Sequence, residues 1–91
     1  MFAQLFEIIQ ERKANPRPES YTNRLLSQGL DAILQKVGEE AVEVILAAKG
    51  QGRERLVAEM ADLFYHSLVL LACQGLNLAD VEDELRRRQR G

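Results

Sequence analysis

The stretch that decides the fold is KVGEEAVEVILAAKGQGRERLVAEMADLFYHSLVLLA, residues 36–72. Apolar residues recur in it every three or four positions, on both sides of a short turn that contains Gly50 and Gly52. This spacing is typical of α-helices, and glycine disfavours a helix interior, so the stretch predicts two consecutive helices. The short turn between them favours antiparallel packing.

Helix boundaries can be assigned outward from this stretch. On its N-terminal side we expect a helix over residues 2–14, followed by a loop with two prolines. Ser20 and Thr22 are both good N-caps for a short helix that stops near Gly29. Asp31 is then expected to cap the first central helix.

The C-terminal part of the chain also predicts helices. The first central helix should end near Lys49, and the second should cover residues 54–74. Asn77 and Asp80 have the spacing of a variant capping box for a last helix over residues 78–90. No stretch alternates with the period of a β-strand, so we predict an all-α bundle of about five helices, one domain over residues 1–91. The last helix should place its inner face, Leu78, Val81 and Leu85, on the bundle.

Composition excludes several classes of function. Hydrophobic residues make up 46% of the chain and charged residues 29%, as in a folded soluble domain. The formal charge of -2 gives no general attraction to nucleic acid or to an anionic membrane, so we predict neither partner. Cys73 is the only cysteine, and we find no signal peptide and no uninterrupted apolar run of about 18 residues. We therefore expect a cytoplasmic protein.

Acidic residues interrupt the apolar pattern of both central helices. At about 100° per residue, Glu40 lies at the edge of the apolar stripe, and Glu43 lies one turn further on. Glu59 and Asp62 project from the second helix, which is apolar nearly all round and therefore expected to be enclosed by neighbours. Lys36 can offset one acid, but buried carboxylates from two helices need more positive charge and are ligands that Mg²⁺ accepts. The sequence predicts a Mg²⁺ site formed by these four acids.

The chemistry that follows from this site is phosphate hydrolysis. A Mg²⁺ ion that keeps several waters usually neutralises phosphate oxygens and activates a water nucleophile. No glycine-rich phosphate loop is present, so the phosphates would be held by the metal and by basic side chains. Taken singly, each acid is more often solvated than catalytic, and His66 is more often structural, so a non-enzymatic helical dimerisation module stays open as an alternative.

Several motifs together resemble one known family. They are P-x-S-Y-T from Pro18, G-L-D from Gly29, K-V-G-E-E-A-x-E from Lys36, A-A-K ending at Lys49, and E-x-A-D-L-x-Y-H from Glu59. The chain resembles the phosphoribosyl-ATP pyrophosphatases over nearly its whole length. The resemblance implies a MazG-like all-α bundle that dimerises. It also implies Mg²⁺-dependent hydrolysis of phosphoribosyl-ATP to phosphoribosyl-AMP and pyrophosphate, the second step of histidine biosynthesis.

The resemblance also implies roles for individual residues. The metal motifs E-x-x-E and E-x-x-D of the family fall on Glu40 with Glu43 and on Glu59 with Asp62. Glu39 is then an outer group, a further ligand or the base that orients the water. We expect Glu39, Glu40 and Lys36 to be catalytic, a carboxylate taking the proton of the water and the lysine stabilising charge on pyrophosphate. The expected substrate-binding residues are Lys13, Ser20, Tyr21, Thr22, Lys36 and Lys49.

Two further questions stay open at this point. Many relatives are fused to phosphoribosyl-AMP cyclohydrolase, whereas this chain would pass its product to that enzyme by diffusion or by contact. The nearest alternative function is a house-cleaning nucleoside triphosphate pyrophosphatase, with the same metal site and a different base or sugar pocket.

Overall fold

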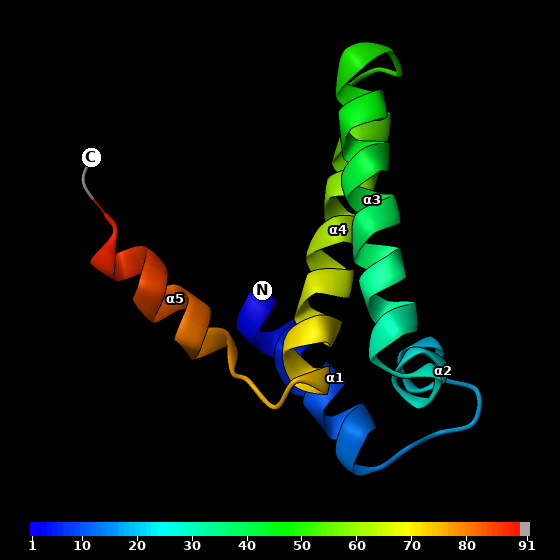
Figure 1. Ribbon diagram of the computed structural model, residues 1–91, viewed down its shortest axis with the longest axis vertical. Helices are drawn as coiled ribbons and strands as arrows, with labels where there is room; N and C mark the ends of the chain where they lie inside the picture. The colour runs from blue at the N-terminus through cyan, green and yellow to red at the C-terminus, as the bar shows by residue number, and fades with distance from the viewer. Residues whose placement is uncertain (90–91) are drawn as a thin grey trace.

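The computed structural model describes residues 1–89, which contain five α-helices and no β-strand (Figure 1). The helices are α1 (Phe2–Ala14), α2 (Tyr21–Gln28), α3 (Leu30–Gly50), α4 (Arg53–Cys73) and α5 (Leu78–Arg87). α3 and α4 form a long antiparallel hairpin, with α1 and α2 at the end opposite its turn and α5 projecting to one side (Figure 1). The predicted all-α class is confirmed.

Local capping signals set most helix ends. The Ser20 hydroxyl accepts a hydrogen bond from the Asn23 N–H at 3.2 Å and caps α2, as predicted. The predicted Asp31 cap is wrong, because α3 begins at Leu30 with Gly29 as its N-cap. Gly29 has a φ of 95°, which glycine adopts without steric cost, so one residue ends α2 and begins α3. Asp31 lies instead in the first turn of α3, where its charge favours the helix dipole.

The hydrophobic core lies at the base of the hairpin, where α1 and α2 pack against the start of α3 and the end of α4. Its buried members are Phe6, Ile9, Leu25, Ile33, Leu68, Val69 and Ala72. α4 packs against α3, α1 and α2, but Val57 and Phe64 are exposed, so the expectation that α4 is enclosed on all sides is wrong for this chain alone. On α3, Ile33 is buried in the core, whereas Ile45 is exposed.

The last helix differs from its prediction in position and length. The capping box is present, with the Asp80 carboxylate accepting from the Asn77 N–H at 2.9 Å. Leu78 packs against the core, but Val81 and Leu85 are exposed, so the predicted inner face is wrong for these two residues. The connection after α4 directs α5 away from the bundle (Figure 1). α5 ends at Arg87, and residue 90 of the predicted helix lies outside the described residues.

By length and composition, α4 is apolar enough to cross a membrane. In this structure it packs against α3, α1 and α2, and it carries the buried polar side chains of Glu59 and His66. Core helices of soluble proteins share this length and hydropathy, so α4 by itself does not indicate a membrane protein.

Candidate metal centre and active site

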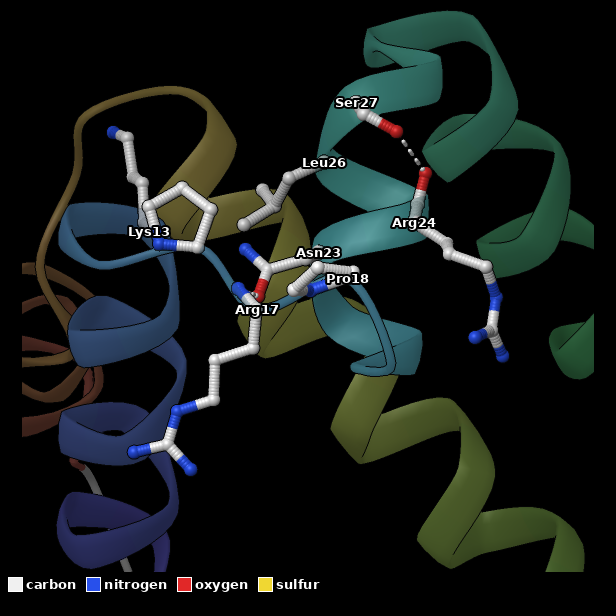
Figure 2. Close-up of a pocket in the computed structure, with 8 residues that line it drawn as sticks. Lys13, Arg17, Pro18, Asn23, Arg24, Leu26 and Ser27 are labelled. Atoms are coloured by element: carbon white, nitrogen blue, oxygen red, sulfur yellow. Dashed lines mark hydrogen bonds between the residues drawn. The ribbon is translucent and has the colours of Figure 1, made fainter.

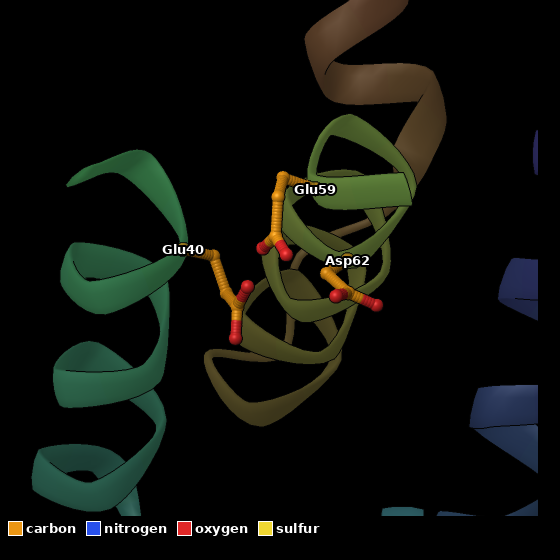
Figure 3. A group of neighbouring side chains, drawn as sticks. All are labelled: Glu40, Glu59 and Asp62. Atoms are coloured by element: carbon orange, nitrogen blue, oxygen red, sulfur yellow. The ribbon is translucent and has the colours of Figure 1, made fainter. Parts of the chain in front are cut away.

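Three carboxylates meet between the two long helices. Glu40 extends from α3 toward α4, where Glu59 and Asp62 project from neighbouring turns (Figure 3). One oxygen from each carboxylate lies within 4.8 Å of the other two. Glu40 and Glu59 are only 9% and 6% exposed, whereas Asp62 is open to solvent. The cluster therefore combines two acids withdrawn from water with one that solvent or a ligand can reach.

Two basic side chains partly compensate this charge. The Lys36 Nζ lies 3.8 Å from a carboxylate oxygen of Glu40, and the Arg55 Nε lies 3.2 Å from one of Glu59. Both pairs join residues four positions apart on one helix. Both cations are more than a third exposed, so solvent weakens each pair. Arg55 was not among the residues predicted for the site, although its spacing of four from Glu59 is a signal visible in the sequence.

The electrostatic surroundings of Glu40 indicate a need for further positive charge. Burial raises the pKa of Glu40 above its ordinary value, and the negative charge of Asp62 raises that pKa further. His66 and Lys36 act in the opposite direction. A divalent cation favours the ionised carboxylates, and hard oxygen ligands from two helices with one side open to water fit Mg²⁺.

Glu39 and Glu43, the other two predicted acids, line a cavity together with the three clustered carboxylates. This cavity has a volume of about 460 Å³ and is lined by Lys36, Glu39, Glu40, Glu43, Arg55, Glu59 and Asp62. Glu43 is half-buried and lies outside the group within 4.8 Å. Glu39 is exposed, and its carboxylate accepts from the Gln35 amide at 3.1 Å. The structure thus gathers three of the four predicted metal ligands and places the fourth beside them.

An aromatic cluster connects α2 to the acid-bearing helix. The Tyr21 hydroxyl lies 2.9 Å from His66 Nε2, and His66 Nδ1 lies 2.8 Å from the backbone carbonyl oxygen of Asp62. The hydroxyls of Thr22 and Tyr65 are also hydrogen-bonded to each other. This cluster was not predicted from the sequence, because its members are distant in the chain and only packing brings them together.

The predicted loop residues differ in their availability to a substrate. The Ser20 hydroxyl caps α2, and the Thr22 side chain is buried against Tyr65, so both are engaged within the fold. Tyr21 is 41% exposed. Of these three residues, Tyr21 has the side chain best placed to contact a ligand.

Lys13 and Lys49 both lie away from the lining of the acid cavity. Lys13 borders a second cavity, of about 480 Å³, between the end of α1 and α2 (Figure 2). Its Nζ donates to the backbone carbonyl oxygen of Ala72 at 2.7 Å, near the C-terminal end of α4, where positive charge favours the helix dipole. Lys49 lies in the exposed last turn of α3.

Fold and site together define an all-helical protein with a candidate divalent-cation site between two antiparallel helices. The sequence model of the family described as phosphoribosyl-ATP pyrophosphohydrolase matches residues 2–89. A phosphoribosyl-ATP pyrophosphatase of Bacillus cereus (strain AH820) is 54% identical over 87 residues, which cover 96% of this chain and 81% of that protein. One of Geotalea daltonii is 52% identical over 84 residues, which cover 92% and 79%. The chain belongs to the phosphoribosyl-ATP pyrophosphohydrolase family, which confirms the resemblance of its motifs.

Proposed function

We propose that this protein hydrolyses phosphoribosyl-ATP to phosphoribosyl-AMP and pyrophosphate, the second step of histidine biosynthesis, as a single cytoplasmic domain. Membership of a family named for this reaction supports the proposal. The observation that carries it is the meeting of Glu40, Glu59 and Asp62 within 4.8 Å beside a cavity. Such a cluster suits a cation-dependent reaction of a polyphosphate.

The cation we propose is Mg²⁺. Glu40, Glu59 and Asp62 would hold it, with Glu43 as a further acid on the cavity wall. When bound, Mg²⁺ supplies neutralisation of phosphate charge and a water of lowered pKa. Because Glu40 and Glu59 are buried and Asp62 is exposed, part of the bound ion would remain accessible to substrate.

Side chains around the cluster would act on the substrate directly. Lys36 reaches Glu39 and Glu40 at 3.8 Å each, so a modest movement of its flexible side chain would bring the ammonium to a phosphate oxygen. There it would stabilise the charge that develops on pyrophosphate as the bond between the α and β phosphates breaks. Glu39 is exposed beside the cluster and is our candidate to accept the proton of the attacking water.

A homodimer is the assembly we propose. The hairpin exposes large apolar side chains on both helices: Val42, Ile45, Leu46, Val57 and Phe64. Extensive exposed apolar surface marks interaction sites, and a second copy would cover α4 where the bundle leaves it open. The product would be the substrate of phosphoribosyl-AMP cyclohydrolase.

Steady-state turnover tests the proposed reaction. Pyrophosphate release from phosphoribosyl-ATP should exceed release from ATP and from noncanonical nucleoside triphosphates at equal concentration. Preference for the nucleoside triphosphates would instead identify the house-cleaning alternative. If the protein releases pyrophosphate from none of these substrates, the result would favour the non-enzymatic dimerisation module.

A further inference from the structure

The hydrogen bonds of His66 determine which atom donates at Tyr21. The backbone carbonyl oxygen of Asp62 only accepts, so His66 Nδ1, 2.8 Å away, carries a hydrogen. In the neutral imidazole Nε2 then has a lone pair and accepts. The Tyr21 hydroxyl, 2.9 Å from Nε2, therefore donates its single proton to His66. The Tyr21 oxygen keeps free lone pairs and has no proton left for a ligand.

This oxygen is linked through His66 to α4 at Asp62, one of the three clustered acids. Its partner His66 is buried and bonds to the backbone of Asp62. The Tyr21 ring stacks with Tyr65 at 6.2 Å between centroids, and the Arg24 guanidinium lies over the Tyr21 ring at 5.7 Å. These contacts fix the ring while the residue stays partly exposed.

An oxygen that can only accept hydrogen bonds binds ligand groups that donate them. Phosphate oxygens are also acceptors, so they cannot pair with it, whereas O–H groups of a ligand can. If the triphosphate lies at the acids, as the proposed function requires, the nearest hydroxyls of phosphoribosyl-ATP belong to the ribose that carries the triphosphate.

We propose that Tyr21 accepts a hydrogen bond from a hydroxyl of this ribose, and that His66 is the positioning residue that keeps the tyrosine an acceptor. The inference rests on the proposed function and adds a means of reading the sugar. Tyr21 is thereby a specificity-determining contact and not a phosphate ligand.

Substrates that lack one hydroxyl test this directly. We would compare kcat/KM for phosphoribosyl-ATP with kcat/KM for its analogues made from 2′-deoxyATP and 3′-deoxyATP. The wild type should prefer the full substrate over one of the two analogues by about 3- to 10-fold, the range for one neutral hydrogen bond. In Tyr21→Phe this ratio should fall to about 1, because only the full substrate loses a contact.

Two further variants separate this role from a structural one. Tyr65→Phe removes a neighbouring hydroxyl that pairs with Thr22, and it should keep the wild-type ratio. His66→Asn retains a donor for the Asp62 carbonyl but lacks the Nε2 acceptor, so the ratio should fall although Tyr21 remains.

Two results would overturn the inference while leaving the proposed function intact. One is an equal loss of kcat/KM on full and deoxy substrates in Tyr21→Phe. The other is a wild type that does not distinguish the full substrate from either analogue, a result that needs no variant to fold. A wild type that hydrolyses none of the three substrates would overturn the proposed function, and this inference with it.

Discussion

A carboxylate oxygen of Glu40 on α3 lies within 4.8 Å of a carboxylate oxygen of Asp62 on α4. The two residues are on different helices that are connected only through the hairpin turn. Two ionised carboxylates at this separation repel each other, and the burial of Glu40 strengthens the effect. Lys36 and Arg55 offset part of the charge. The hairpin thus holds an arrangement that costs stability without a cation and suits a divalent ion.

Glu40→Gln should stabilise the metal-free protein at neutral and alkaline pH. The pKa of Glu40 is raised in the folded state from 4.5, so the unfolded chain releases its proton first as pH rises. The carboxyl therefore favours folding below pH 4.5, and that contribution is lost as pH rises through the raised pKa. Thermal melting in EDTA should show a gain of a few degrees near pH 8 and convergence with the wild type at low pH.

Glu39→Gln is the matched control for that melting experiment. Glu39 is the exposed neighbour of Glu40 on the same helix and also contacts Lys36. Its replacement should leave the melting temperature nearly unchanged at every pH. A melting temperature for Glu40→Gln at or below that of the wild type at alkaline pH would contradict the electrostatic account of the site.

Turnover should depend unequally on the four predicted metal ligands. Removing a group that only supports a metal ligand typically lowers metal affinity or activity by about 10- to 100-fold. Removing a ligand itself should cost at least as much, so Asp62→Asn or Glu59→Gln should lower kcat by about 100-fold or more. Glu43→Gln should cost less, because Glu43 lies outside the group of closely spaced oxygens. Kinetics at saturating Mg²⁺ would measure this order, and a larger loss for Glu43→Gln than for Asp62→Asn would show that the ligand set is misassigned.

Phe64→Glu should dissociate the proposed dimer. Phe64 is 41% exposed, with one edge of its ring against Phe2 of α1, and a charge there would be unpaired in an interface between copies. Sedimentation should show a monomer. Leu85→Glu, on the projecting α5, is more exposed and serves as a control that should remain dimeric. A wild type that sediments as a monomer would rule out the proposed assembly.

Thr22→Val should destabilise the protein by about 1–3 kcal/mol, the cost of leaving a buried hydrogen-bonding group without its partner. The change keeps the size of the side chain and removes the hydroxyl that pairs with Tyr65 between α2 and α4. Ser27→Ala removes an exposed hydroxyl on the same helix and should cost much less. Urea denaturation measures both, and equal stabilities would show that the buried pair contributes nothing.

The features predictable from sequence were those set by neighbouring residues. Helix ends near Ser20 and Asn77 follow from local capping, and the burial of Glu40 and Glu59 follows from helical periodicity. Contacts between distant segments were not predictable in this way. The pairing of Tyr21 with His66 depends on how α2 packs on α4, and the exposure of Leu85 depends on the direction in which the chain leaves α4.

Calorimetric titration of EDTA-treated protein with Mg²⁺ measures whether Glu40, Glu59 and Asp62 form a cation site, with Asp62→Asn as the comparison and thermal melting as the second measurement. The wild type should bind the ion saturably and gain about 2.7 kcal/mol of stability at a free concentration 100 times Kd, because only the folded chain brings the three acids together. Asp62→Asn should show neither the binding heat nor the gain. Wild-type protein whose heat and melting temperature do not respond to millimolar Mg²⁺, or respond equally in the variant, would contradict the account.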